Sequence, residues 1–212
     1  MIVQNRNTKI VAATEADTEE ILRLYKAQLG QEFCPWDEHY PERENIAFDL
    51  KRDALFVMKN EKDEIIAAIS IDEDPDVEAL TCWSRQLQPG GELSRLAVRQ
   101  DYQNQGIART MIEYAMDILR EQGKKSVHYL VCPSNTKAVR SYEHLHFSQV
   151  GTCELHELPY LCYEQKLKRS QKNPGVPAPG FFVPYFRYSS VFKLPSSNVY
   201  SGVRNGYVTS SS

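Results

Sequence analysis

The stretch from Glu92 to Gly123 constrains the fold most strongly, because it predicts a strand, a polar turn and a long helix in direct succession. The strand is expected over Glu92–Val98, and apolar residues at helical spacing predict a helix from about Ile107 to Gln122. Gly123 should end this helix, since glycine readily adopts the left-handed conformation beyond a helix C-terminus. A strand that feeds a helix in this way indicates an α/β domain.

The other elements follow from apolar runs and helical periodicity, separated by turns rich in Pro, Gly and charge. Further strands are expected at Lys9–Ala13, Ala54–Met58, Ile65–Ile71 and Val127–Val131, and within Gln149–Glu154 and Tyr160–Leu167. Further helices are expected at about 17–29, Glu42–Lys51 and Asn135–His144. The resulting order, β-α-α-β-β-β-α-β-α-β-β, predicts a mixed α/β sheet.

The character of the chain changes near residue 169. The segment 169–212 is rich in Pro and Ser and contains no Asp or Glu, which argues against regular structure. It is also too aromatic for an ordinary linker. We therefore expect a domain over 1–168 and an irregular tail over 169–212. The tail either docks on the domain or on another subunit, or forms a poorly ordered appendage.

Composition excludes several classes of protein. The chain of 212 residues has a net charge of −3, so nucleic acid is a poor default partner. No apolar run approaches 18 residues and the start is polar, so neither a membrane span nor a secretory signal is expected. The 5 cysteines form no C-x-x-C pair and the 5 histidines show no ligand spacing, which predicts reduced thiols, no metal and a cytoplasmic location.

The turn before the long helix can bind an anion. A helix N-terminus carries unpaired amides and partial positive charge, and the small residues Gly106 and Ala108 leave those amides accessible. The turn lacks the G-K-[ST] ending of a P-loop and is not a G-x-G-x-x-G fingerprint. A plain strand–helix turn is the alternative interpretation.

Two motifs resemble those of the GNAT N-acetyltransferase superfamily. Gln103-x-x-Gly106-x-Ala108 resembles its motif A, and the segment from Asn135 to Phe147 resembles its motif B, with His146 where the family usually has Gly. The resemblance covers about residues 10–167 and implies a splayed, mixed central sheet flanked by helices, with acetyl-CoA as co-substrate. It implies that the cofactor is bound by Leu96, Ala97, Val98, Gln103, Asn104, Gln105, Gly106, Ile107, Ala108 and Asn135.

Acyl transfer to an amine needs a base and an acid. Glu92 is the candidate base, because some family members place a glutamate at this strand position; the alternative is a solvated residue at the strand's start. Simple alternation would put Glu92 on the same face as Ser94, Leu96 and Val98. Tyr142 matches the motif B tyrosine that resembles the family's general acid; the alternative is a core tyrosine. A covalent route through Cys132 is less favoured.

Aromatic residues ahead of the Glu92 strand are candidates for the acceptor pocket: Trp36, Tyr40 and Trp83. Nearby acids such as Asp37 and Asp72 would favour a cation, although a loop lid and a solvated acidic turn are the alternative. Together with these features, the resemblance implies an N-acetyltransferase that moves an acetyl group from acetyl-CoA to a primary amine, by direct attack in a ternary complex. The acceptor would be a small molecule, a peptide N-terminus or a lysine, and a homodimer is one option. A non-catalytic acyl-CoA sensor and a protein-interaction module on the same fold are the rivals.

Overall fold

The computed structural model describes residues 8–31, 34–136, 138–139, 145–155 and 157–168. All of them belong to the first of the two units into which the chain divides, Met1–Gln171; the second, Lys172–Ser212, lies outside the described residues. The predicted tail is therefore not described, and the predicted boundary near residue 168 stays a prediction.

The described strands and helices follow the expected order. The strands are β1 Lys9–Ala12, β2 Leu55–Lys59, β3 Ile65–Asp72, β4 Gly90–Val98, β5 Ser126–Val131, β6 Ser148–Leu155 and β7 Leu158–Lys166. The helices are α1 Thr18–Lys26, α2 Arg43–Lys51, α3 Pro75–Glu78 and α4 Ile107–Glu121. Short 3₁₀ turns precede α1, β4 and α4. The predicted helix Asn135–His144 falls largely on residues outside the described set.

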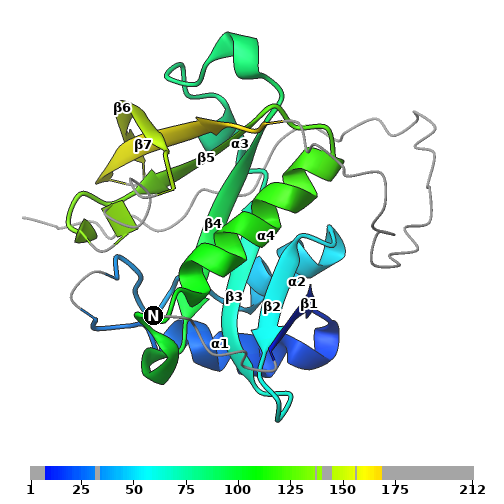
Figure 1. Ribbon diagram of the computed structural model, residues 1–212. Helices are drawn as coiled ribbons and strands as arrows, with labels where there is room; N and C mark the ends of the chain where they lie inside the picture. Colours follow the sequence, from blue (N-terminus) through cyan, green and yellow to red (C-terminus); the bar gives the residue numbers. More distant parts are fainter. Residues whose placement is uncertain (1–7, 32–33, 137, 140–144, 156, 169–212) are drawn as a thin grey trace, which may run out of the picture. The chain divides into compact units, whose positions relative to one another are not determined.

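The strands form one seven-stranded mixed sheet in the order β1-β2-β3-β4-β5-β7-β6. All neighbouring strands are antiparallel except β4 and β5, which are parallel. This parallel pair is short: it joins Gly90 to Ser126, Gly91 to Val127 and Glu92 to His128, and no further register pair follows. Beyond Glu92 the two strands diverge (Figure 1). The expectation of a splayed α/β sheet is confirmed.

Each face of the sheet has its own hydrophobic packing. The largest core cluster joins α4 to one face, with Met111, Ala115 and Leu119 fully buried against residues of β2, β3, β4, β5 and β7. On the other face, α1 and α2 cover β2 and β3 through a second cluster that includes Ile21, Tyr25 and Ile46. A third, small cluster of Val77, Trp83 and Cys162 lies on β5 and β7.

Helix ends and turns agree well with the sequence signals. Gly123 has φ +79° just beyond the end of α4, as expected of a residue that terminates a helix. His146, which replaces the family's usual Gly, also lies in the left-handed region with φ +65°. The tight turn into β6 is thus preserved, with a strained backbone at a non-glycine residue.

The structure adds elements that the sequence did not predict. Helix α3 forms within the acidic turn: Asp74 accepts the Asp76 amide at 2.9 Å, and Pro75 occupies the first helical position. Strand β4 begins at Gly90, two residues before the predicted start, because Gly90 and Gly91 pair with β5.

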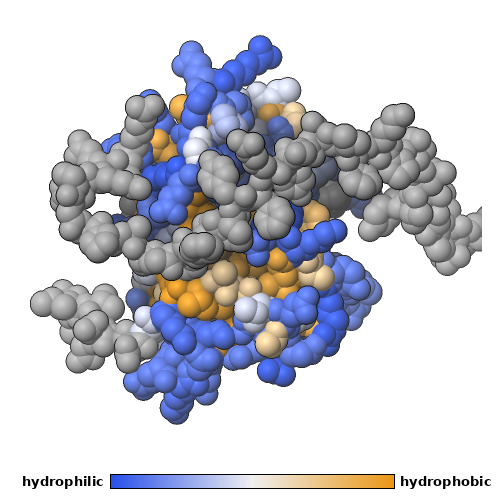
Figure 2. Space-filling view, turned by 90° about the vertical axis from the view of Figure 1, so that its right-hand side faces the viewer, coloured by the Kyte–Doolittle hydropathy of each residue, from blue (hydrophilic) through white to orange (hydrophobic). Residues whose placement is uncertain are grey.

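Partly buried apolar residues extend the largest core cluster toward the surface. Ile10, Tyr114 and Ile118 pack against that cluster without being fully enclosed. Figure 2 shows an area of apolar residues on one face of the molecule, with hydrophilic residues above and below it. Within the described part of the chain, no helix is both long and apolar enough to span a membrane.

Candidate functional site

The turn into α4 presents its backbone openly. Gly106 is the N-cap of α4 and has φ +80°, a conformation that side chains rarely adopt, and a Cβ at this position would meet nothing within 4 Å. Among the described residues, none accepts a hydrogen bond from the backbone amides of Gly106, Ile107 or Ala108. Gly106 is exposed and the next two residues are half-buried. This arrangement offers unpaired amides and the positive end of a 15-residue helix to an anion.

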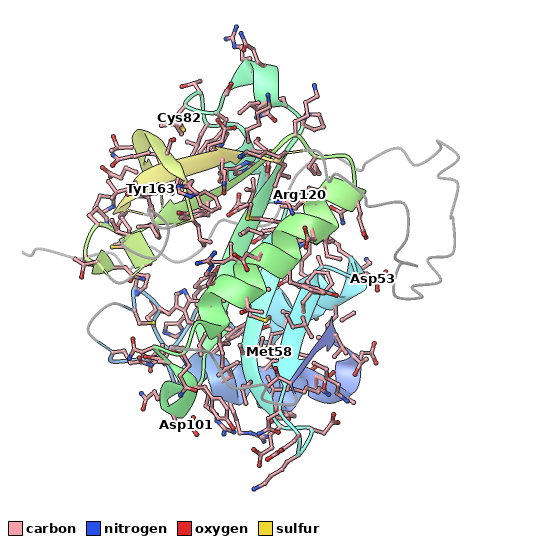
Figure 3. The ribbon with its side chains drawn as sticks, viewed as in Figure 1. Asp53, Met58, Cys82, Asp101, Arg120 and Tyr163 are labelled. Atoms are coloured by element: carbon pink, nitrogen blue, oxygen red, sulfur yellow. The ribbon has the colours of Figure 1, made fainter. Side chains whose placement is uncertain are left out.

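Side chains hold the turn in place from both ends. The Gln103 amide donates to the Val98 carbonyl at 3.1 Å and so ties the turn to the end of β4. Gln105 donates to the Asp101 carbonyl at 2.9 Å, and Asn104 takes a left-handed conformation with φ +59°. Asp101, labelled near this end of α4 in Figure 3, pairs with Arg99 at 2.8 Å. Several residues expected to surround the diphosphate therefore shape the loop through their side chains.

The other predicted cofactor residues lie on the two sides of the strand divergence. Leu96, Ala97 and Val98 form the end of β4, where the strand pairs with β3 and no longer with β5. Asn135 follows β5, and its side chain accepts the Ala138 amide at 3.0 Å, so it caps the turn that follows. The structure brings these two groups to the open part of the sheet.

Glu92 occupies the last paired position before the strands separate. It is only 6% exposed, and its Oε2 atom has no hydrogen-bond partner among the described residues. The pKa of the Glu92 carboxyl is raised to about 8, first by burial and then by the charges of Asp72 and Asp74, with Arg95 opposing them. A solvated position at the start of the strand is excluded by this burial.

A β-bulge in β4 changes which residues share the face of Glu92. Arg95 has φ +47°, and the β3–β4 register shifts between the pairs Ser70–Ser94 and Ala68–Ala97. Leu96 and Val98 consequently pack toward the α4 cluster, whereas Glu92 lies beside Asp72 on the face that carries α2. The expectation that simple alternation would place all of them on one face is wrong.

The bulge also carries a buried ionic network. The Arg95 guanidinium donates to both carboxylate oxygens of Asp49, at 3.0 and 2.8 Å, and lies 2.6 Å from Asp72. Arg52 binds the same two carboxylates from the other side, at 2.8 and 3.3 Å. Ser70 completes the network with a 2.6 Å bond to Asp49. Two guanidinium groups thus pair with two buried carboxyl groups, which offsets the cost of burying them.

The network continues to Tyr40, one of the predicted acceptor residues. Arg95 donates to the Tyr40 hydroxyl at 3.1 Å, and the Trp36 ring stands edge-on to Tyr40 at 6.4 Å. Burial raises the pKa of the Tyr40 phenol, Arg95 lowers it, and Asp72 and Glu92 raise it further. Tyr40 therefore lies within electrostatic reach of Glu92, as an acceptor-binding residue would.

A second tyrosine approaches this region from β7. Burial raises the pKa of the Tyr160 phenol, and the next largest contributions come from Cys132 and Tyr40. Tyr160 was not a sequence candidate, because nothing in the sequence shows that β7 returns beside β5. The structure thus places two tyrosines, from separate parts of the chain, on the face that carries Glu92.

Trp83 lies apart from Trp36 and Tyr40. It is 5% exposed, its indole donates to the Val77 carbonyl at 2.7 Å, and its ring stacks on His128 at 4.5 Å. Its neighbour Cys82, labelled in Figure 3, packs against the β6–β7 hairpin, where a Cβ on Gly151 would come within 2.7 Å of the cysteine Cβ. The three aromatic residues do not form one wall.

Tyr142, the predicted general acid, lies outside the described residues, so its role stays a prediction. The sequence analysis missed Asp49, Arg95 and His128. Their signal was weak, because each is only an ionisable residue among the apolar residues of a predicted helix or strand. Among the described side chains, no three His, Cys, Asp or Glu residues gather as a metal site requires.

Comparisons with known proteins agree with this geometry. The model of the acetyltransferase (GNAT) family matches residues 7–147. The fold resembles a GNAT-family acetyltransferase from Staphylococcus aureus, with a TM-score of 0.60 at 18% identity, covering 76% of this chain and 99% of that one.

Two further structures are similar to the same extent. The ribosomal-protein-S18-alanine N-acetyltransferase of Escherichia coli has a TM-score of 0.58 at 17% identity, with 78% of this chain and 97% of that one covered. The protein yncA of Salmonella typhimurium, described with its cofactor acetyl-CoA, has a TM-score of 0.60 at 17% identity, with 76% and 95% covered.

A search of curated proteins gave no match. The family model nevertheless spans the splayed strands, the open turn before α4 and the segment that follows β5. On this match, and with a fold that agrees with it, the chain belongs to the acetyltransferase (GNAT) family.

Proposed function

We propose that this chain is an N-acetyltransferase that moves the acetyl group of acetyl-CoA to a primary amine by direct attack in a ternary complex. The observation that carries the proposal is Glu92: a buried carboxyl with an unpaired oxygen, placed where β4 and β5 separate. Membership of a family of acetyltransferases supports acetyl transfer in general.

The diphosphate of acetyl-CoA would bind at the amides of Gly106, Ile107 and Ala108. Unpaired amides and the helix dipole favour its negative charge, and the bare backbone of Gly106 permits a close approach. The pantetheine arm would extend along Leu96–Val98, where β4 lacks a partner on its β5 side. Asn135 would meet the cofactor from the segment after β5.

The acceptor would enter on the face that carries Glu92 and Tyr40. A free alkylamine has a pKa near 10.4, so neutralising it at pH 7 costs roughly 4 to 5 kcal/mol. A carboxylate whose pKa is raised to about 8 is a stronger base than an ordinary glutamate and can take that proton. The neutral amine would then attack the thioester carbonyl, and Tyr142 would protonate the departing thiolate. The proton that the attacking nitrogen loses on becoming an amide would restore the Tyr142 phenol.

The charges around the acceptor favour a cation. Because Arg95 and Arg52 balance Asp49 and Asp72, the ionised form of Glu92 leaves an uncompensated negative charge beside Asp74. An ammonium group is attracted to such a site before it loses its proton. The acceptor is a small-molecule amine, a peptide N-terminus or a lysine side chain.

The test is amine-dependent release of the CoA thiol from acetyl-CoA, measured over a panel of amines, amino acids and peptides. The account expects at least one amine to accelerate thiol release well above hydrolysis. Thermal stabilisation by CoA without thiol release from any member of the panel would support a non-catalytic acyl-CoA sensor instead.

The pH dependence of kcat/KM distinguishes the titration of Glu92 from the titration of the acceptor amine. For the wild type, kcat/KM should rise with pH through about 8 as Glu92 ionises, and it should rise again as the free ammonium acceptor loses its proton. Glu92→Gln should lack the limb near 8 and keep the limb that belongs to the amine. A variant that retains both limbs would remove Glu92 from the mechanism.

Tyr142→Phe tests the acid separately. Without the phenolic proton the thiolate leaves unprotonated, so kcat should fall about 10- to 1,000-fold while CoA affinity stays nearly unchanged. Thermal stabilisation by CoA measures the affinity, and turnover measures the loss. Equal turnover in the two proteins would assign Tyr142 to packing.

A further inference from the structure

A row of ionisable residues crosses the sheet through Glu92. Strand pairing places Asp72 opposite Glu92, Glu92 opposite His128, and His128 opposite Glu164, on β3, β4, β5 and β7 respectively. All four are buried, with exposures of 8%, 6%, 0% and 4%. Because paired residues of neighbouring strands point to the same face, this row forms a continuous polar strip inside the protein.

Three atoms of this strip have no hydrogen-bond partner among the described residues: Glu92 Oε2, His128 Nδ1 and Glu164 Oε1. Buried polar groups without partners are costly and therefore uncommon. All three belong to residues that follow one another in the strand register, with His128 between Glu92 and Glu164. Packing alone does not account for unpaired polar atoms on adjacent residues. A proton transfer between Glu92 and His128 through a bridging water does.

The space between β4 and His128 is kept open by a glycine. A Cβ on Gly90 would lie 2.9 Å from His128 Nδ1 and 2.8 Å from the Ser126 hydroxyl, closer than real Cβ contacts occur. Gly90 lies two residues before Glu92, on the same face of β4. The unpaired nitrogen of His128 is thus directed toward the strand that carries Glu92.

The other nitrogen of His128 leads to the surface. Nε2 lies 3.0 Å from the Glu78 carboxylate, and the Glu78 side chain is 36% exposed at the end of α3. Trp83 stacks on the imidazole and fixes its plane. The ionisable groups near Glu92 are Tyr40, Asp72, Asp74, Arg95 and His128. Those near His128 are Glu92 on β4, Glu78 on α3 and Glu164 on β7.

We propose that His128 passes the reaction proton from Glu92 to Glu78, which releases it to solvent. His128 thus acts through Glu92 and does not contact the substrate. This inference rests on the proposed function. An ammonium acceptor and acetyl-CoA give an amide, the CoA thiol and one excess proton. Glu92 takes that proton from the ammonium nitrogen. With both substrates in the cleft, His128 offers a route away from them.

Each transfer balances. The proton leaves Glu92, reaches His128 Nδ1 across one bridging water, and forms an imidazolium between two carboxylates. The imidazolium then releases its Nε2 proton to Glu78, which exchanges it with bulk water. Glu92 is left ionised. After the products leave, exchange with solvent returns the remaining His128 proton from Nδ1 to Nε2, so that both groups can accept the next proton. Glu164, whose Oε2 accepts the Ser84 amide at 3.1 Å, stabilises the imidazolium by its charge.

The experiment begins with wild-type turnover on the best amine, because absence of turnover would refute the proposed function rather than the relay. His128→Ala is then expected to lower kcat at least tenfold while thermal stabilisation by CoA stays as in the wild type. Imidazole added to the buffer should fill the space beside Trp83 and restore turnover in proportion to its concentration. A structural role would not respond to imidazole in this way.

Trp83→Phe is the matched packing control, since it disturbs the same stack without removing a proton carrier, and imidazole should not affect it. Glu78→Gln covers the case in which His128→Ala fails to fold. Its partly exposed site should tolerate the change, and kcat should fall several-fold. Glu73→Gln makes the same change at a 66% exposed acid nearby and should be silent.

Two results would overturn the relay. One is a folded His128→Ala protein that binds CoA and either turns over like the wild type or stays slow at every imidazole concentration. The other is Glu78→Gln turning over like Glu73→Gln.

Discussion

Burial raises the pKa of the Glu92 carboxyl, and it also lowers the stability of the folded protein when that carboxyl is ionised. Its carboxyl has a pKa of about 8 in the folded protein and about 4.5 when unfolded, so between these values the folded state binds more protons. Stability must therefore fall as pH rises from about 4.5 to 8. The fall reflects the cost of placing a negative charge beside Asp72 and Asp74 in a buried position.

Glu92→Gln should remove this pH-dependent loss. The variant is expected to unfold at a higher temperature than the wild type at pH 8, and the difference should shrink toward pH 5, where both side chains are neutral. Thermal unfolding at the two pH values measures it. A difference that is constant over this range would mean that Glu92 does not titrate between pH 5 and 8.

At Gly106, conformation and charge can be separated. Both Asn and Asp tolerate the left-handed backbone better than other side chains, and the space around a Cβ there is open. Gly106→Asp should weaken CoA binding about 10- to 1,000-fold more than Gly106→Asn, because it adds a negative charge at the anion site. Titration calorimetry at low and high salt measures the gap, which should narrow at high salt. Equal affinities of the two variants for CoA would show that the CoA diphosphate does not bind at this turn.

Sequence patterns predicted residues whose role is local and missed those whose role depends on distant partners. Gly106 and Gly123 could be recognised because helix ends require particular backbone conformations. Arg95 and Asp49 could not, because their meaning comes from a contact between residues 46 positions apart. Glu92 was identified by family position, but its burial follows from the packing of β3, β5 and α3 around it.

At the level of elements, β4 and α4 act as one unit. Gly91 faces Leu119 so closely that a Cβ on Gly91 would lie 2.3 Å from a Leu119 methyl carbon. Leu119 is fully buried, so it has little room to move. This contact sets how near the helix lies to the strand, and hence where the N-terminal amides of α4 stand relative to the end of β4.

Gly91→Ala should destabilise the protein by about 1–3 kcal/mol through overpacking. Leu119→Ala should destabilise it by about 2–5 kcal/mol through a cavity. The double variant should lose less than the sum, because the new methyl group enters the space that Leu119 leaves. Denaturant unfolding of the four proteins measures the coupling. Additive losses would show that the two positions do not share this space.

The long periodic helix and the strand order were predictable, whereas the local irregularities were not. The α4 pattern is strong because its buried positions recur at helical spacing over 15 residues. The bulge at Arg95 has no such signal, since one extra residue in a strand looks the same in the sequence as a regular strand. The bulge reverses the face of every later residue in β4. Leu96 and Val98 therefore lie on the α4 face and not, as expected, on the face of Glu92.

At the scale of the molecule, the candidate site lies where the sheet opens between β4 and β5. The three register pairs between β4 and β5 hold the two halves together at one end, and divergence leaves the other end open. Each half has its own core on the face of the sheet that carries Glu92, and Glu92 lies between the two. The fold class was predictable from element order, while the position of this opening required the strand pairing.

A chain that ends at Lys168 tests the domain boundary. Because the sheet, both core faces and the α4 turn lie before that residue, the shortened protein should fold and bind CoA as tightly as the full chain. A saturating ligand at about 100 times its dissociation constant adds roughly 2.7 kcal/mol of stability, so thermal shifts can measure both proteins. A shortened protein that folds and gains no stability from CoA would assign the segment 169–212 to the cofactor site.

The placement of the diphosphate can be observed directly in the amide NMR signals of Gly106, Ile107 and Ala108. The ¹⁵N-labelled protein would be titrated with CoA and, separately, with acetyl-pantetheine, which lacks the diphosphate. The account predicts that CoA shifts these three amides strongly and that acetyl-pantetheine leaves them nearly unchanged. Saturable binding of CoA that leaves all three amides in place would contradict it.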